Sequence, residues 1–332
     1  MIARKSLFGG IAGLLMISAG AALPGASAVA ADNFPEKELT FIVPWPPGGG
    51  ADMMARMIGE AIAKDLGTSL VVENRPGAAG IVGTQLAARA QPDGHTLLLG
   101  STGPNSISAA LYENLPYDPV EDFTPITQIT SLPLLLSINA NLPFETAQDL
   151  IDYARENPGE LNYGSVGEGT AQHLASEIFK ITAELDMVHV PYDGSTPAFS
   201  ALAGGEVDML FDNIMASQAM IDSGRVRPIG ISSLDRSPAK PDVPTIDESA
   251  LEGFDVVAFQ NILVPAGTPT EIVHKLHTAI VDYLGSDEMQ ARAEELGAIL
   301  VGNSPEEEKQ RIKDAVEQWS AAAEAAGISL EY

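Results

Sequence analysis

The sequence predicts an α/β protein made of two doubly wound, mainly parallel sheets that are joined by two hinge strands. Short apolar runs alternate with helix-period segments along the chain, which is typical of parallel sheets covered by helices. This alternation occurs in two successive units. Two extended runs, residues 131–138 and 255–265, are longer than the other expected strands and stand at the edges of the second unit.

The first 31 residues predict a secretory signal peptide. Arg4 and Lys5 precede an apolar stretch from Leu7 to Leu23, and small residues that include Ala-Ser-Ala and Ala-Val-Ala follow. This order of a positive region, an apolar region and an A-x-A site is the pattern of a cleaved leader. A single membrane anchor is the alternative, but glycines interrupt the apolar run and favour cleavage. Residues 1–31 are therefore not assigned to the fold.

Composition excludes several classes of partner. The chain has 45 acidic and 18 basic residues, and loss of Arg4 and Lys5 with the leader lowers the formal net charge from −27 to −29. A field of this sign repels nucleic acid and anionic membranes, so no nucleic-acid partner is expected. No other long apolar run occurs, which predicts a soluble mature protein. The chain has no cysteine, and about 300 residues suffice for one large or two medium domains without disulfides.

The expected elements follow this order. In the first unit we expect strands at 41–43, 70–73 and 96–100, and helices at 53–66 and 81–90. In the second unit we expect helices at 149–156, 169–183 and 196–204, and strands at 161–164, 186–191, 207–211 and 226–232. Three helices, at 270–284, 287–296 and 305–326, form the tail.

The two long runs suggest a division into domains. Domain 1 is expected to comprise residues 33–134 plus 256–332, and domain 2 to comprise residues 135–255. The runs would then cross between the domains as paired hinge strands, so that a cleft opens and closes around a ligand. One continuous sheet with two longer strands is the alternative.

The loop after the first strand predicts an anion site built from backbone. Three prolines stiffen the exit from the strand, and Gly48, Gly49 and Gly50 let a ligand approach the backbone closely. Asp52 is expected at or near the cap of a helix that begins at Met53, whose N-terminal N–H groups favour negative charge. No lysine follows the glycines, and residue 53 is Met, so neither nucleotide-binding pattern is complete. A carboxylate fits better, and a stiff turn without a ligand is the alternative.

Other loops should share the same edge of the sheets. Residues 73–80 and 100–106 follow the next two strands, and the carboxyl edge of a parallel sheet is where α/β ligand sites form. In the second unit, residues 163–172, 191–196 and 211–213 offer matching loops, with Thr170 as a helix cap. Each loop alone is more often a cap or a turn than a ligand contact. Their convergence on one cleft is what favours binding.

At these residues the chain resembles a known family. The motifs that carry the resemblance are Ile-Val-Pro at 42–44 with Gly-Ala-Asp at 50–52, Glu-Asn-Arg-Pro-Gly at 73–77, Pro-Asp-Gly-His-Thr-Leu-Leu at 92–98, Tyr-Asp-Pro at 117–119, Phe-Thr-Pro-Ile at 123–126, Pro-Tyr at 191–192, Gly-Glu-Val-Asp at 205–208, Phe-Asp-Asn at 211–213 and Val-Pro-Ala-Gly-Thr-Pro at 264–269. In this order they resemble the Bug family of periplasmic solute-binding proteins, the TctC-like receptors of tripartite tricarboxylate transporters.

The resemblance implies a two-domain periplasmic-binding-protein fold, a Venus flytrap of type II-like form. It implies a monomer without cofactor or metal that holds a small carboxylate largely through backbone groups and bridging waters, and delivers it to membrane permease subunits. The ligand-binding residues that we expect are Trp45, Pro47, Gly48, Gly49, Asp52, Ala79, Ser101, Asn105, Ser165, Thr170, Ala171, Asp193 and Asp212. Three positions depart from the family pattern: the third loop has no histidine, Ala79 replaces a usual glycine, and Asp193 follows Pro-Tyr.

Rival chemistries are weaker. Ser165 with His173 or His189 suggests a periplasmic hydrolase, but the G-x-S-x-G pattern fails at Tyr163, so a loop serine and unrelated histidines are favoured. Arg75 either binds a ligand carboxylate or pairs with a nearby acid. A receptor that reports to a membrane sensor would have the same cleft and differ only in its partner. The sequence leaves the identity of the carboxylate open.

Overall fold

The computed structural model describes residues 33–48, 50–168 and 170–329. The expected signal peptide lies outside these residues. The chain begins with β1 (Leu39–Val43), α2 (Gly50–Leu66), β2 (Leu70–Asn74), η1 (Ala78–Gly80), α3 (Ile81–Ala88), β3 (Thr96–Ser101), η2 (Gly103–Ile107) and α4 (Ser108–Leu111). It continues through β4 (Phe123–Asn139), α5 (Ala147–Glu156), β5 (Asn162–Ser165), α6 (Ala171–Ala183), β6 (Val188–Pro191), α7 (Ser195–Gly204), β7 (Met209–Asn213), α8 (Ile214–Asp222), β8 (Val226–Ile231) and α9 (Ile246–Ser249). The last elements are β9 (Val257–Pro265), α10 (Thr270–Leu284), α11 (Asp287–Leu296), β10 (Ile299–Leu300) and α12 (Pro305–Ala326).

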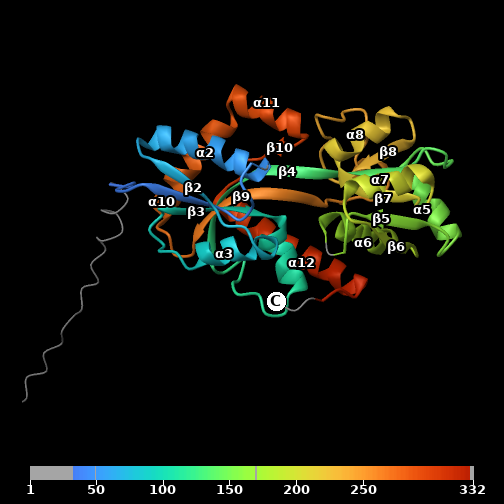
Figure 1. Ribbon diagram of the computed structural model, residues 1–332, viewed down its shortest axis with the longest axis horizontal. Helices are drawn as coiled ribbons and strands as arrows, with labels where there is room; N and C mark the ends of the chain where they lie inside the picture. Colours follow the sequence, from blue (N-terminus) through green and yellow to red (C-terminus); the bar gives the residue numbers. More distant parts are fainter. Residues whose placement is uncertain (1–32, 49, 169, 330–332) are drawn as a thin grey trace, which may run out of the picture.

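The strands form two lobes that share one strand. Along the hydrogen-bonded path their order is β2-β1-β3-β9-β4-β7-β5-β6, and β8 and β10 also pair with β4. Pairing is parallel within β2-β1-β3 and within β6-β5-β7, and antiparallel at β9 and β4. Figure 1 shows β4 and β9 running between the lobes. The two-domain α/β fold class is confirmed.

The pairing of β4 combines features of the two arrangements expected from the sequence, which are two hinged domains and one continuous sheet. Its residues 123–133 pair with β9, whereas residues 134–139 pair with β7 and β8. The two sheets are therefore continuous through β4 and yet lie in different lobes. The second connection is the extended segment near Val256, whose N–H donates to Ser232 O while Ser232 N–H donates to Leu134 O. The exact domain limits given above remain a prediction.

Several expected boundaries were wrong. β4 starts at Phe123, eight residues before the expected run, because threonine and isoleucine in its first half also suit a pleated surface. The third loop, expected to be irregular, is helical from Gly103 to Leu111. α8 begins directly after β7 and was not expected, since its apolar residues lack a clear helical period.

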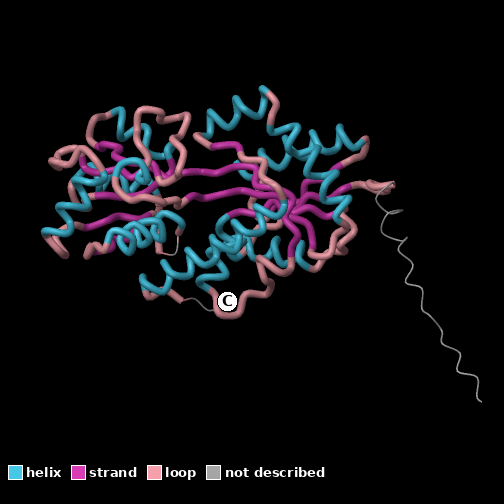
Figure 2. The backbone as a smooth tube through the Cα atoms, turned by 180° about the vertical axis from the view of Figure 1, so that it is seen from behind, coloured by secondary structure: helices cyan, strands magenta, loops and turns pink. Residues whose placement is uncertain are grey.

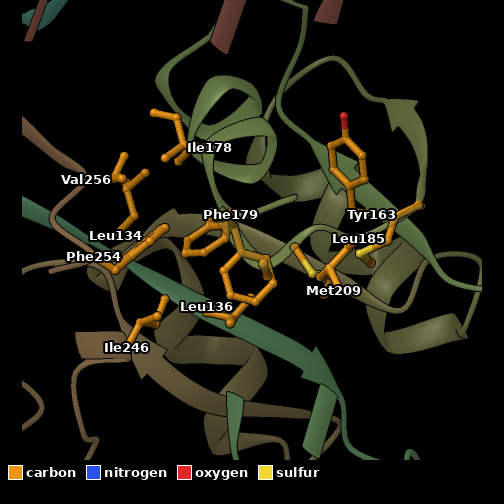
Figure 3. Close-up of a cluster of buried hydrophobic side chains, with 14 of the residues drawn as sticks. Leu134, Leu136, Tyr163, Ile178, Phe179, Leu185, Met209, Ile246, Phe254 and Val256 are labelled. Atoms are coloured by element: carbon orange, nitrogen blue, oxygen red, sulfur yellow. The ribbon is translucent and has the colours of Figure 1, made fainter. Parts of the chain in front are cut away.

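The core of the second lobe is an aromatic and aliphatic cluster between its sheet and α6 (Figure 3). Phe179 on α6 is fully buried, and its ring centroid lies 5.7 Å from that of Phe211 on β7 and 6.0 Å from that of Phe254. A separate cluster under α2 and α10 fills the first lobe. Each lobe therefore has its own hydrophobic core, as independent domains require.

α12 belongs to both lobes. Ser304 caps it in a capping box with Glu307, Pro305 occupies its first turn, and Gly327 ends it in a left-handed conformation. The helix extends from the first lobe toward α6 of the second (Figures 1 and 2). Trp319, Ala322 and Ala323 are buried in the core cluster of the second lobe. Among the helices of the described residues, none is long and apolar enough to cross a bilayer.

Phe179→Ala should destabilise the second lobe by about 3–5 kcal/mol, because it removes a fully buried ring and leaves a cavity. Ile181→Ala on the same helix is the control: Ile181 is 46% exposed, and its loss should cost less than about 1 kcal/mol. Urea denaturation followed by circular dichroism measures both. Equal losses in the two variants would contradict this description of the core.

Candidate functional site

The first loop leaves β1 at Val43 and enters α2 at Gly50. Pro44 is buried, whereas Pro47 and Gly48 are exposed, and Gly48 has a φ of +85°, which side chains rarely adopt. Trp45 is half-buried, and its carbonyl accepts a 3.0 Å hydrogen bond from Asn74 Nδ2 at the end of β2. Gly49 lies outside the described residues. The loop thus presents exposed backbone beside the N-terminus of α2.

Asp52 holds this loop from inside the helix. It lies in the first turn of α2 and not at its cap, because the helix begins three residues earlier than expected. Its buried carboxylate accepts from Gly48 N (2.9 Å), from Asn74 Nδ2 (2.9 Å) and twice from the Arg56 guanidinium (3.1 and 2.9 Å). Each oxygen therefore has two donors. Asp52 positions the loop through these contacts, which are all within the first lobe.

The hydrogen bonds from Arg56 and then from Gly48 hold the pKa of Asp52 at about 2, against an opposing effect of burial. Sequence analysis had not paired Asp52 with Arg56 or Asn74. The spacing of four residues between Asp52 and Arg56 on one helix is a signal that could have found the first pair. Nothing in the sequence pointed to Asn74, which comes from the neighbouring strand.

The second loop meets the first and third loops around Gly80. Ala78 and Ala79 have left-handed φ values of 44° and 52°, in a backbone region that non-glycine residues rarely occupy. A Cβ placed on Gly80 would lie 3.2 Å from Pro104 Cγ and 3.5 Å from both Pro44 Cβ and Trp45 Cζ2. The three loops are therefore packed together at the carboxyl edge of β1, β2 and β3, as expected. Ala79 is exposed there.

The third loop contributes two polar side chains, each with one atom that lacks a hydrogen-bond partner among the described residues. Asn105 is fully buried, and its Oδ1 accepts the Ser101 N–H at 2.9 Å. Asn105 Nδ2 and Ser101 Oγ are both buried without a hydrogen-bond partner among the described residues. An unpaired buried polar atom costs about 1–3 kcal/mol, so a ligand or a water molecule that pairs with it is favoured.

The second lobe presents a matching set of loops. Thr170 caps α6 by accepting the His173 N–H at 3.3 Å, as expected, and donates its hydroxyl to Gly167 O at 2.7 Å. Ala171 is the first residue of that helix. Tyr192 N–H donates to Ser165 O, which joins the loops that follow β5 and β6. Asp193, on the second of these loops, is exposed.

Asp212 is the second-last residue of β7, at the carboxyl edge of the sheet. It is fully buried, and its Oδ1 accepts from Gln172 Nε2 (3.1 Å) and from Asn213 N–H (2.7 Å). Its Oδ2 is buried without a hydrogen-bond partner among the described residues. Gln172 was not expected to take part, although its place beside Ala171 at the start of α6 could have suggested it.

The predicted site residues therefore fall into two sets, one in each lobe. The first contains Trp45, Pro47, Gly48, Asp52, Ala79, Ser101 and Asn105, and the second contains Ser165, Thr170, Ala171, Asp193 and Asp212. Each set combines exposed loop backbone with buried polar side chains. Within the described ranges, no hydrogen bond joins one set to the other.

A serine and a histidine that were expected to be unrelated are in contact in the structure. Ser165 Oγ lies 2.7 Å from His189 Nε2, so the expectation of an unrelated loop serine and histidine was wrong. Ser165 ends β5, and His189 lies opposite Tyr163 in the parallel register of β6, which no local pattern reveals. His189 also stacks on Tyr163 and His173, with ring centroids at 4.8 and 3.9 Å. Burial lowers the pKa of both histidines, that of His173 to about 4.

The surroundings of this pair differ from those of a catalytic serine and histidine. Ser165 is fully buried, and its hydroxyl also lies 3.3 Å from both Gly167 O and Gly167 N. Among the described residues, His189 has no hydrogen bond to a carboxylate that would orient it as a general base. The contacts instead hold the loop between β5 and α6 in place.

Arg75, the other residue left open by the sequence, pairs with a nearby acid. Its Nη2 lies 2.9 Å from Glu73 Oε2 in a salt bridge, and both side chains are partly exposed. No group of three or more potential metal ligands occurs in the part of the chain that the structure describes.

Asp52→Asn should destabilise the protein at neutral pH, and the difference from wild type should shrink in acid. The lowered pKa means that the folded state favours the ionised carboxylate. Its contribution is complete above the ordinary value of 3.8 and is lost as the pH falls through about 2. Urea denaturation at several pH values measures it. Asp65→Asn, an exposed change on the same helix, should have little effect at pH 7. An Asp52→Asn difference equal at pH 2 and pH 7 would contradict the prediction.

Comparisons with known proteins identify the family of this chain. The chain matches the family described as "Tripartite tricarboxylate transporter family receptor" (TctC) over residues 54–328. It is 39% identical over 289 residues to a UPF0065 protein from the tcbD-tcbE intergenic region of Pseudomonas sp. strain P51, covering 87% of this chain and 86% of that one. It is 33% identical over 322 residues to protein BugT of Bordetella pertussis, covering 97% and 98% of the two chains.

Two solved structures are also similar. R. palustris Rpa4515 with adipate has 35% identity and a TM-score of 0.68, covering 90% of this chain and all of that chain. MatC from Rhodopseudomonas palustris with bound malate has 32% identity and a TM-score of 0.65, covering 87% of this chain and 99% of that chain. The fold, the order of the loops and these matches lead to one conclusion: the chain belongs to the TctC family of solute-binding receptors of tripartite tricarboxylate transporters.

Proposed function

We propose that this protein is a periplasmic receptor that captures a small organic carboxylate between its two domains and delivers it to the membrane permease subunits of its transporter. The observation that carries the proposal is the pair of loop sets at the carboxyl edges of the two sheets. Each set combines exposed backbone with a buried side chain that has an unpaired polar atom. The relatives with bound adipate and malate support a carboxylate as the ligand.

The first loop and the start of α2 would bind one carboxylate group. Backbone N–H groups at a helix N-terminus attract negative charge, and exposed Gly48 leaves them open to a ligand. Asp52 does not oppose this binding directly, because the Arg56 guanidinium offsets its charge and four hydrogen bonds occupy its two oxygens. Asn105 Nδ2, a donor, and Asp212 Oδ2, an acceptor, would meet the other end of the ligand directly or through water.

Domain closure would complete the site. The two sets lie on different lobes, and β4 together with the segment near Val256 connects those lobes. Ligand contacts made by both sets at once would stabilise the closed form by the difference in affinity between the two conformations. No covalent chemistry is required of any residue.

A carboxylate of the correct class should raise the melting temperature of the mature protein, since a ligand that binds only the folded state stabilises it by about 2.7 kcal/mol at a hundredfold excess over Kd. A thermal-shift panel of mono-, di- and tricarboxylates, amino acids, aromatic acids and neutral sugars measures this rise. All samples need equal ionic strength, because salt alone screens the repulsion within a mature chain of formal net charge −29, which is −27 less Arg4 and Lys5. A shift with a sugar or a nucleotide and with no carboxylate would overturn the proposal.

Gly48→Ala should weaken carboxylate binding by roughly tenfold, because alanine is strained at a φ of +85° and displaces the loop backbone. Gly50→Ala is the matched control. Both positions have open space for a methyl group, but Gly50 opens a helix, where alanine is favourable. Isothermal titration calorimetry with the ligand found in the panel compares them. Equal affinity in the two variants would argue against backbone recognition at Gly48.

A further inference from the structure

A buried network connects the third ligand loop to α12. At its centre is Glu308, in the first turns of α12, which is fully buried. Its Oε1 accepts from Asn261 Nδ2 (2.6 Å) and Arg311 Nη2 (2.5 Å), and its Oε2 accepts from Arg311 Nε (2.7 Å) and Asn303 Nδ2 (3.2 Å). A buried carboxylate with this many donors has one geometry in which all of them are satisfied, so it fixes the side chains around it.

The first link from Glu308 leads through Asn261 to the loop. Asn261 lies on β9 directly opposite Gly100 of β3. A Cβ placed on Gly100 would overlap both Asn261 Oδ1 and Asn105 Oδ1, so the two amide groups converge on this glycine. Asn105 in turn holds the Ser101 N–H. The two side chains meet at Gly100 by packing and not by a hydrogen bond, because Asn261 Oδ1 and Asn105 Nδ2 are buried without a hydrogen-bond partner among the described residues.

The second link runs in parallel through Phe259. Thr102 Oγ1, in the third loop, accepts the Phe259 N–H at 2.6 Å, and both residues are buried. The Arg311 guanidinium lies 3.6 Å from the centroid of the Phe259 ring. Both links therefore end on the same ion pair of α12, Glu308 with Arg311.

The far end of α12 is fixed to the other lobe. Trp319 is buried there with Ala322 and Ala323, and the helix packs on α6, which carries Thr170 at its cap. Between the two ends, Gln318 Nε2 donates to Asp255 O, beside the second connection between the lobes. The single helix α12 therefore contacts the third loop of the first lobe, the connection between the lobes at Asp255, and α6 of the second lobe.

We infer that Glu308 and Asn261 are positioning residues for ligand capture. They hold the third loop in its binding conformation and, through α12, couple that loop to the movement of the second lobe. This inference rests on the proposed function for its ligand-dependent part. Glu308 is not expected to touch the ligand, because both of its carboxylate oxygens have their hydrogen bonds within the network. Asn261 donates to Glu308 through Nδ2, and its Oδ1 is buried without a hydrogen-bond partner among the described residues.

Glu308→Gln tests the inference, because it removes the charge and keeps the size. Glu306→Gln, the same chemical change at an exposed position of the same helix, is the control. Hydrogen exchange of the ligand-free proteins should be roughly tenfold faster at residues 102–107 in Glu308→Gln and unchanged in Glu306→Gln. Residues 70–74 of β2, at the far end of the strand order in the first lobe, should exchange equally in all three proteins. Equal exchange at residues 102–107 in both variants would overturn the inference.

Measurements with ligand distinguish a positioning role of Glu308 from a contribution to folding stability alone. With the carboxylate identified by the thermal-shift panel, wild type should gain protection at α6 and α12, and Glu308→Gln should lose that gain and bind roughly tenfold more weakly. A stability effect alone would leave affinity unchanged far below the melting temperature, and that result would overturn the coupling. If no carboxylate binds wild type, the proposed function fails, while the ligand-free exchange still decides the role of Glu308.

A second variant, Arg311→Lys, tests the same network if Glu308→Gln does not fold. Arg311→Lys keeps a positive charge beside Glu308 but loses the paired N–H geometry and the flat contact with Phe259. It should increase exchange at residues 102–107 by a smaller factor than Glu308→Gln. Wild-type exchange at these residues in Arg311→Lys, together with wild-type affinity, would contradict a role for the ion pair.

Discussion

Backbone pairing along β4 is the constraint on which the two-lobed arrangement depends. The partner of this strand changes at Pro133 and Leu134, from β9 on one side to β7 on the other. Register shifts within both halves let the strand twist between sheets of different orientation. Because both sheets are hydrogen-bonded to the same strand, relative motion of the lobes must be concentrated where the partner changes. The two loop sets lie at the carboxyl edges of the sheets that this strand joins.

Local dipoles explain how so acidic a protein can receive an anion. A formal net charge of −27 repels anions at long range, but at about 0.1 M salt this repulsion is largely screened beyond about 10 Å. At contact, the N–H groups of the first loop and of α2 act without screening. The negative charge of Asp52 is offset by Arg56, and its hydrogen bonds with Gly48 and Asn74 hold the loop in place. The buried ion pair of Glu308 and Arg311 works in the same way beneath the third loop.

Local sequence patterns predicted much of the fold and part of the candidate site. The helix α12 has its expected limits because local signals mark both ends. Ser304 and Pro305 start the helix, and Gly327 ends it. Thr170 was correctly predicted as a cap for the same reason. The third loop was not predicted as helical, because its Gly-Pro-Asn-Ser sequence is more typical of turns and the helix depends on packing against α12. The left-handed backbone of Ala79 was not predicted, although the glycine that is usual at this position in the family is a sign of a positive φ.

The sequence by itself determined the order of elements, the caps, the glycine-rich loops and, through their motifs, the family. These features depend on residues within about one helical turn of each other, so their physical causes are local. Only the tertiary structure decided that Asp52 pairs with Asn74, that Ser165 meets His189, and that Glu308 binds Asn261. Each of these contacts joins residues that are more than 20 positions apart in the chain and on different elements. Such contacts form only after the sheets have aligned their strands, and no periodicity in the sequence encodes them.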